Sequence, residues 1–284
     1  MQLLPQRILP GICLLLLSFV IPTVAQQVAI MSPDGSEASR HFAEILEGEI
    51  AAKYRIVDTT MSEAAFASTK AADKFNMSVE ESKAAGLAIG CDFFILVKAE
   101  TTRRSSSVQA KYYESHAAVY SVSTRTGRLV FWALPRFNAT TEQEAKALLN
   151  AAANPLASEI ANKLRIAAKS ELAEPLLVKM DEPPDADSPL ARSLRTPIPY
   201  RRIKPEYTSD AFLYAITATV DIIVDLDERG LILRTEITRW AGYGLDESVE
   251  KAVRSMNWRP AERNGKPLPM RFLLRYNFKK TDKD

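Results

Sequence analysis

Apolar and polar positions follow their clearest pattern between residues 216 and 278. Apolar side chains alternate with polar ones from Ile216 to Leu226, which is the period of a strand with one buried face. Gly230 then supplies a turn, since glycine tolerates the positive φ that tight hairpins need. The pattern predicts a return strand whose buried face is formed by Leu231, Leu233, Thr235 and Ile237.

A helix and a third strand are predicted after this hairpin. Asp246 stands where a side chain can cap a helix N-terminus, and Pro260 ends the helix. The apolar stripe of this helix consists of Leu245, Val249, Ala252, Val253 and Met256. The Asn264-Gly265 turn leads into a last strand, whose apolar face consists of Leu268, Met270, Phe272, Leu274, Tyr276 and Phe278. The expected fold of this part is an α+β layer in the order β-β-α-β.

Several short motifs accompany this pattern between about residues 200 and 280. They are Lys204-Pro205-Glu206-Tyr207, Leu245-Asp246, Ala252-Val253, Trp258, Pro260-Ala261 and Asn264-Gly265-Lys266-Pro267. Together these motifs resemble the C-terminal domain of TonB, the energy transducer of Gram-negative bacteria. This chain departs from that family at Thr208, where the family usually has proline, and at Trp240 and Tyr243, where it usually has small residues.

The first half of the chain predicts an α/β domain with a mixed sheet covered by helices. Its elements follow the order β-α-β-α-β-β-β-α, and Ser78 and Glu81 have the spacing of a capping box ahead of the second helix. Pro155 is expected to kink or split the last helix. The expected strands cover 28–31, 54–58, 93–99, 108–123 and 128–137, and the first and last helices cover about 37–53 and 141–166.

The first half also carries a weaker resemblance. Segments 54–58, 88–96 and 119–132 are similar to periplasmic domains of the CsgG, LpoB and TolB N-terminal kind. This resemblance implies a domain that assembles or binds at the cell envelope and has no catalytic activity.

The segments outside the two domains indicate the compartment. Residues 1–25 contain an apolar run followed by Thr23-Val24-Ala25, a pattern typical of a cleaved secretory signal peptide. A periplasmic protein is therefore expected, and the alternative is an uncleaved inner-membrane anchor facing the periplasm. The expected domains are 26–169 and 200–284, and the proline-rich acidic stretch 170–199 is expected to be a semi-extended linker.

Charge and residue types give little support for catalysis or for nucleic-acid binding. The net charge of +2 provides no field that would favour nucleic acid. His41 and His116 are the only histidines, and signal removal would leave Cys91 as the only cysteine, so no metal site or nucleophile is expected. Asp225 and Asp227 flank a turn and are expected to be solvated. The chain is thus expected to be no enzyme and to bind no cofactor, metal or small-molecule substrate.

The TonB resemblance implies the remaining function, which is partner capture by strand addition. The candidate edge is the last strand, where Arg271, Leu273, Arg275 and Asn277 are the expected partner-binding residues. The expected partner is a segment of an envelope or outer-membrane protein. Two alternatives stay open for this edge, because the first domain or a second copy of the chain in a homodimer can cover it.

Two functions remain open on this basis. One is a binding or scaffolding protein of the envelope. The other is an energy transducer for outer-membrane receptor transport. The apolar segment contains no histidine and the linker is short, and both features favour the binding protein.

Overall fold

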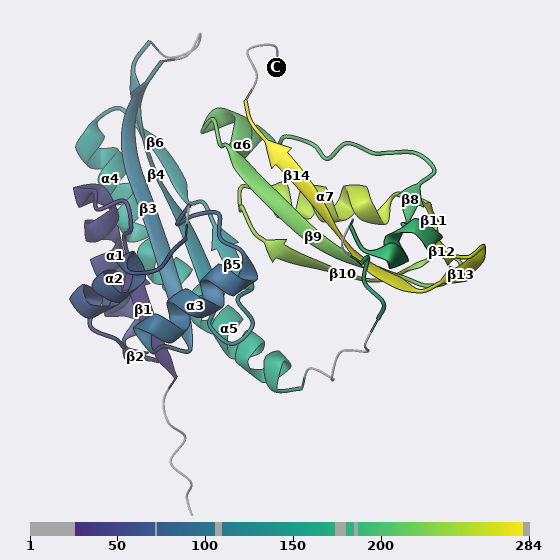
Figure 1. Cartoon of the computed structure of the whole chain (residues 1–284). Coiled ribbons are helices and arrows are strands. Elements are labelled where there is room, and N and C mark those ends of the chain that lie inside the picture. Colours follow the sequence, from purple (N-terminus) through teal and green to yellow (C-terminus); the bar gives the residue numbers. More distant parts are fainter. Residues whose placement is uncertain (1–25, 72, 106–109, 174–179, 185–186, 281–284) are drawn as a thin grey trace, which may run out of the picture.

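A computed structural model describes residues 26–71, 73–105, 110–173, 180–184 and 187–280. The expected signal segment, residues 1–25, lies outside the described residues. Two α/β layers lie side by side (Figure 1), one formed by residues before 174 and the other by residues after 187; they are called here the amino-terminal and carboxyl-terminal halves. Within the described residues, no helix has the length and apolar character needed to span a membrane.

A mixed sheet forms the centre of the amino-terminal half. Its strand order is β2-β1-β3-β4-β5, with β6 also paired to β4. Strand β1 runs parallel to β2 and β3, and the other pairs are antiparallel. This arrangement confirms the mixed sheet predicted from the sequence. The strands are β1 (Gln27–Met31), β2 (Arg55–Ile56), β3 (Phe93–Arg104), β4 (Tyr112–Ser123), β5 (Leu129–Ala133) and β6 (Arg136–Ala139).

Helices flank this sheet. They are α1 (Glu37–Ile50), α2 (Thr59–Ala67), α3 (Val79–Ile89), α4 (Glu142–Ala151) and α5 (Ala153–Leu172). The predicted capping box is present at the start of α3, because Ser78 and Glu81 each accept a hydrogen bond from the other's backbone. The long helix predicted at the end of this half is split at Ala152. Pro155 then lies in the first turn of α5, where a missing N–H costs no helical hydrogen bond.

The two faces of the amino-terminal sheet are covered differently. Alternate strand residues such as Ile30 and Ile95 pack in one cluster with Phe42 of α1 and Ile160 of α5. The opposite face packs against residues of α2 and α3 and then continues into the core of the carboxyl-terminal half. One face is therefore covered by helices of its own half, whereas the other face depends partly on the carboxyl-terminal half.

A three-stranded antiparallel sheet in the order β10-β9-β14 forms the carboxyl-terminal half. Its main elements are α6 (Ser209–Leu213), β9 (Ala218–Leu226), β10 (Ile232–Arg239), α7 (Leu245–Arg254) and β14 (Met270–Phe278). The apolar face predicted for β9 is confirmed, because Val220, Ile222 and Val224 are fully buried, and Asp221 and Asp225 on the other face are buried as well. The half is rich in sheet, as predicted, and short strands are interposed between α7 and β14.

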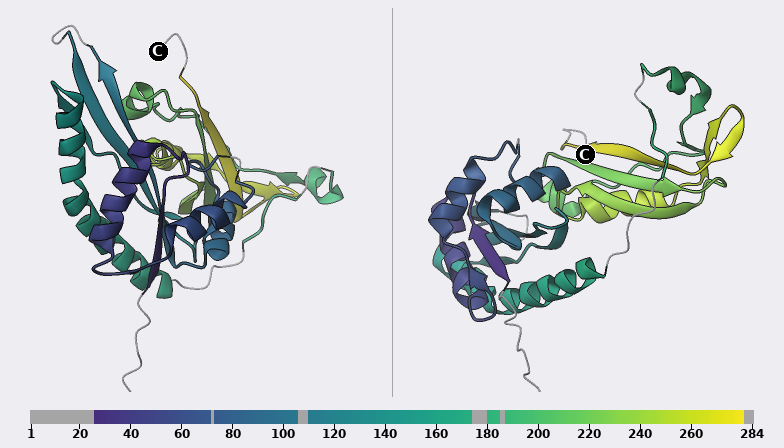
Figure 2. Two further views of the ribbon diagram at one scale, coloured as in Figure 1. Left: turned by 90° about the vertical axis from the view of Figure 1, so that its left-hand side faces the viewer. Right: turned by 60° about the horizontal axis from the view of Figure 1, so that its bottom comes forward.

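Short strands from before α6 and from after α7 lie together at the end of the carboxyl-terminal half that is remote from the other half (Figures 1 and 2). They are β7 (Leu194–Arg195), β8 (Ile198–Pro199), β11 (Trp258–Arg259), β12 (Ala261–Arg263) and β13 (Lys266–Leu268), preceded by a 3-10 turn at Pro189–Ser193. Strand β7 pairs with β12, and β8 pairs with β11. The stretch 170–199, expected to be a semi-extended linker, is thus ordered at its C-terminal end by the backbone pairing of β7 and β8.

Three local expectations are corrected by the structure. The Asn264-Gly265 turn joins β12 to β13, and the last long strand begins only at Met270. A register shift between Ile232 and Arg234 leaves Leu233 bulged, so Leu231 and Leu233 are exposed and Ile232 packs on the core. Gly244 is the N-cap of α7, whereas Asp246 is the second residue of the helix and accepts hydrogen bonds from the N–H groups of Ala241 and Gly242.

Aromatic rings join the two halves. The Tyr120 ring on β4 lies 5.4 Å from the Trp240 ring, and the Trp132 ring on β5 lies 5.2 Å from the Tyr243 ring. Trp240 is 1% exposed. A Cβ atom at Gly242 would stand 2.5 Å from Trp132 Nε1, so this close approach requires glycine. The two residues that depart from the TonB family's small side chains are therefore buried against the amino-terminal half.

Asn76 joins the same two halves through hydrogen bonds. This side chain is 7% exposed and lies in the loop between α2 and α3. Its Nδ2 donates to the Thr219 carbonyl at 2.8 Å and to the Trp240 carbonyl at 2.7 Å, and its Oδ1 accepts from the Thr219 N–H at 2.9 Å. The side-chain amide of Asn76 thus satisfies backbone groups of Thr219 and Trp240 at the point where β10 no longer pairs with β9.

Asn76→Ala is expected to destabilise the whole protein. The substitution leaves the three backbone groups of Thr219 and Trp240 without their partner in a buried place, at a cost of about 2–4 kcal/mol. Urea unfolding followed by circular dichroism measures this loss. Asn162→Ala, on the exposed face of α5, is the matched control and should change the free energy of unfolding by less than about 0.5 kcal/mol. Equal effects of the two substitutions would contradict the role given to Asn76.

Candidate functional site

The carboxyl-terminal sheet has two edges, and one of them is closed at its end by the amino-terminal half. At the end of β10, the Trp240 N–H donates to the Met77 carbonyl at 3.3 Å. Ser78 forms an antiparallel bridge with Arg239 at the same place. The segment before α3 thus occupies the last positions of the β10 edge.

The other edge is β14, where the sequence placed the site. Strand β14 pairs with β9 from Met270 to Phe278. The Arg271 N–H points away from β9, because it donates to the Asp181 carbonyl at 2.9 Å. Backbone groups alternate between the two sides of a strand, so those of Leu273, Arg275 and Asn277 also point outward. Across the described residues, no other backbone hydrogen bond from outside the sheet reaches this edge.

Asp181 covers only the beginning of this edge. It forms a parallel bridge with Met270, and its carboxylate lies 3.1 Å from Arg263 Nη1. In a parallel ladder alternate residues face the partner strand, so Pro183 would be the next to donate. Proline has no N–H, and the pairing ends there. The edge beyond Arg271 therefore keeps its outward backbone groups.

Arg271 and Arg275 are held on the face of the sheet. Nε and Nη2 of Arg271 donate to the two carboxylate oxygens of Asp225 at 2.7 and 2.8 Å, and Arg275 makes the same pair of contacts with Asp221. The hydrogen bond to Asp225 raises the pKa of Arg271. Asp225 is 4% exposed, so the expectation that it is solvated is wrong. The guanidinium group that pairs with Asp225 belongs to Arg271, which lies 46 residues further along the chain.

Leu273 and Asn277 lie on the same face as the two arginines. The Leu273 side chain is 52% exposed, and Asn277 Oδ1 accepts from Thr219 Oγ1 at 2.9 Å. A groove of about 850 Å³ crosses this face. Leu273 and Ile223 line its apolar part, and Pro183 and Pro197 line it from the preceding segment. The four residues predicted from the sequence are thus close together, on or beside a strand edge that, among the described residues, is paired only at its beginning.

The groups most suited to chemistry lie elsewhere and are engaged in structure. Burial raises the pKa of Cys91 to about 11, which keeps its sulfur protonated and weakly nucleophilic. His116 is buried against the ring of Tyr214, with ring centres 4.3 Å apart, and burial lowers its pKa. His41 is exposed on α1. The described residues contain no group of histidine, cysteine and carboxylate side chains that could hold a metal ion.

Asp246 has a strongly shifted pKa. Burial raises the pKa of this carboxyl from 3.8 to about 7. Its oxygens accept hydrogen bonds from the N–H of Ala241 at 2.9 Å and of Gly242 at 2.8 Å. Asp246 therefore holds the loop that presents Trp240 and Tyr243 to the amino-terminal half. The sequence predicted only a helix-capping role for this residue, whereas the structure buries its carboxyl group.

Comparison with known proteins supports the resemblance of the last third of the chain. Residues 203–279 match the family described as Gram-negative bacterial TonB protein C-terminal. This match confirms the family resemblance predicted for that region. It includes α6, β9, β10, α7 and β14, and therefore contains the whole candidate edge. No curated protein sequence matches the chain.

Three solved structures show distant similarity to this chain. Lipoprotein GNA1162 from Neisseria meningitidis is 15% identical, with a TM-score of 0.34 over 48% of this chain and 99% of that one. A PelC dodecamer from Paraburkholderia phytofirmans is 13% identical, with a TM-score of 0.29 over 49% of this chain and 88% of that one. The hypothetical protein CT253 from Chlamydia trachomatis is 14% identical, with a TM-score of 0.28 over 52% and 96%. Similarity at this level supports no conclusion about function.

Amide exchange should distinguish the two sides of β14. The amide hydrogens of Leu273, Arg275 and Asn277 are expected to exchange quickly because they face outward, whereas those of Leu274 and Tyr276 are protected by β9. Hydrogen exchange followed residue by residue by NMR checks this alternation. Uniform protection along the strand would mean that this edge is covered in solution.

Asp246→Asn should remove a pH dependence of stability. The folded protein holds this proton up to pH about 7, whereas the unfolded chain loses it near 3.8, so the free energy of unfolding falls as pH rises between those values. The fall attributable to Asp246 is about 4 kcal/mol. Urea unfolding across this range should give a flatter profile for Asp246→Asn than for the wild type. Glu228→Gln, at the exposed hairpin tip, is the control and should keep the wild-type profile.

Proposed function

We propose that this chain is a non-enzymatic binding or scaffolding protein of the bacterial cell envelope, located in the periplasm. In this proposal, β14 captures an extended segment of an envelope or outer-membrane protein by strand addition. The observation that carries the proposal is the row of outward backbone groups at Leu273, Arg275 and Asn277. The family match of residues 203–279 supports the envelope location.

An unpaired edge favours pairing with an extended peptide for a physical reason. Each new backbone hydrogen bond contributes about 0.5–1.5 kcal/mol net, so the few bonds available beyond Arg271 amount to only a few kcal/mol. Ordering a peptide consumes a large part of this gain. Side-chain contacts must therefore supply the remaining affinity, and selectivity along with it.

The groove beside β14 can supply these contacts. Side chains of an added strand alternate between the two faces of the sheet, so every second one lies over the groove. Leu273 and Ile223 offer apolar surface there, and Arg271 and Arg275 are already neutralised by Asp225 and Asp221. This chemistry favours a segment with apolar residues at alternate positions over a strongly charged one.

The amino-terminal half supports a scaffolding role. The aromatic interface fixes it against the carboxyl-terminal half, so a segment captured on β14 is held in a defined orientation to the amino-terminal sheet. The alternative, an energy transducer with an uncleaved membrane anchor, differs in the fate of residues 1–25. Sequencing the N-terminus of the protein from the envelope separates the two proposals, because a chain that begins at Gln26 has no membrane anchor.

Leu273→Pro should abolish partner capture without unfolding the protein. The Leu273 N–H points outward, so proline removes a donor from the free edge and leaves the β9 ladder intact. The readout is a photo-crosslinking amino acid at position 277, with the captured segment mapped by mass spectrometry. Capture should fall to background in the proline variant.

Leu273→Ala is the matched control for this experiment. It removes the side chain but keeps the backbone donor, so the crosslinked product should persist at a reduced yield. Circular dichroism of both variants verifies the fold. An unchanged yield in a folded Leu273→Pro protein would refute strand addition at β14.

A further inference from the structure

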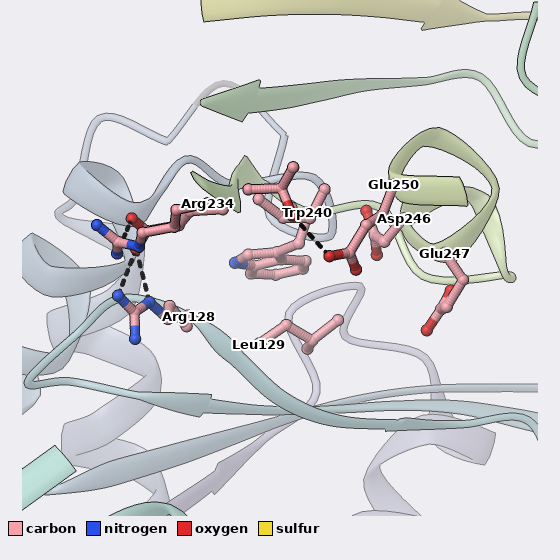
Figure 3. A pocket seen from close by; sticks show the side chains of 10 residues that line it. Arg128, Leu129, Arg234, Trp240, Asp246, Glu247 and Glu250 are labelled. Atoms are coloured by element: carbon pink, nitrogen blue, oxygen red, sulfur yellow. Dashed lines mark hydrogen bonds and ion pairs between the residues drawn. The ribbon is translucent and has the colours of Figure 1, made fainter. Parts of the chain in front are cut away.

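A second cavity lies between the two halves of the molecule, away from β14. Its volume is about 380 Å³, within the range of roughly 300–1,000 Å³ that is usual for small-molecule sites. Leu129 on β5 closes it from the amino-terminal half, and β10 and α7 close it from the carboxyl-terminal half. Figure 3 shows Trp240 between a group of two arginines and a group of carboxylates.

One end of this interdomain pocket carries positive charge. Arg128 Nε donates to Glu236 Oε1 at 2.6 Å, and Arg234 Nη2 donates to Glu236 Oε2. Two guanidinium groups therefore share one carboxylate. Arg234 Nη1 is buried and has no hydrogen-bond partner among the described residues. A buried donor of this kind is costly unless an oxygen is provided to it.

The opposite end carries negative charge. Asp246, Glu247 and Glu250 all project from the first two turns of α7 into the lining of the pocket. Glu250 already accepts from Thr235 and Arg254, whereas Glu247 is exposed. Proximity to Glu247 also contributes to the raised pKa of Asp246, after the larger effect of burial. A cation at this end would relieve the repulsion between these carboxylates.

An apolar surface separates the two ends. The ring of Trp240 lies between them, with Leu129 and Ile237 also in the lining (Figure 3). Trp240 is 1% exposed, so Leu129 and Ile237 provide most of the apolar surface that a ligand can reach. The pocket is thus positive at one end, apolar in the middle and negative at the other end.

We propose that this pocket binds a small zwitterionic ligand, namely a free dipeptide, with its carboxylate at Arg234 and its ammonium group at Glu247 and Asp246. The side chains of the dipeptide lie over Leu129 and Ile237. A simple anion would be repelled by Glu247 and Glu250 of α7, and a simple cation would leave Arg234 Nη1 without a partner. Only a ligand with both charges satisfies both ends.

Binding of this ligand has two physical consequences. The pocket is lined from both halves, so an occupied pocket stabilises their interface and raises the melting temperature. An ammonium group beside Asp246 favours its ionised form, so the complex releases a proton near neutral pH. Proton release is a signature that a nonspecific surface contact would not produce.

The test is isothermal titration calorimetry of the full chain with alanyl-leucine as the probe. Its N-acetyl and C-amide derivatives each remove one charge and should bind at least about tenfold more weakly, which corresponds to about 1.4 kcal/mol. Titration near pH 6.5 in two buffers of different ionisation enthalpy should reveal the released proton. Asp246→Asn should suppress this release.

Variants identify the two ends. Arg234→Gln should weaken the binding of alanyl-leucine at least tenfold but leave the binding of the C-amide derivative unchanged. Glu247→Gln is an exposed substitution that does not threaten folding. It should also weaken the binding of alanyl-leucine at least tenfold, but leave the binding of the N-acetyl derivative unchanged. Glu228→Gln is the matched control and should bind as the wild type does. Leu273→Pro should also bind alanyl-leucine normally, which separates this site from partner capture on β14.

Other outcomes overturn the proposal. The absence of binding heat and of any melting shift at millimolar alanyl-leucine would refute a dipeptide site. Equal binding of the probe and both blocked derivatives would refute recognition of the two charges. Binding that survives both Arg234→Gln and Glu247→Gln would place the ligand outside this pocket.

Discussion

The aromatic contact between the two halves is the interaction on which the rest of the structure depends. The amino-terminal sheet has one face covered by its own helices and another that α2 and α3 cover only in part. Tyr120 and Trp132 occupy that second face and require a partner to exclude water. Trp240 and Tyr243 supply it, so each half completes the core of the other.

This contact also decides which edge of the carboxyl-terminal sheet is available. The segment that contains Asn76 and Met77 lies at the end of β10 because the halves are held together there. The β14 edge lies on the other side of β9, where Asp181 is the only described residue that pairs with its beginning. The packing of the two halves thus covers the end of the β10 edge and leaves the outward backbone groups of the β14 edge available. Strand addition is proposed at the β14 edge.

The sequence predicted features that arise from local periodicity and missed those that arise from distant partners. Strand β9 and the capping box at Ser78 follow from residue spacing alone, and both are present. The bulge at Leu233 leaves no trace in a period-two pattern, and the burial of Asp225 depends on an arginine of β14. Trp240 stood out only as a departure from a family pattern, although that departure was the signal of the interface and its pocket.

The loop around Gly242 bears on whether residues 203–279 can be expressed as a separate domain. The stretch with family likeness, residues 203–279, would suggest a piece that can be transplanted or expressed by itself. Excision would place the indole of Trp240 and the ring of Tyr243 in water together with the apolar surface they cover, which invites self-association. The boundary of the family match therefore cuts through a hydrophobic core that both halves share.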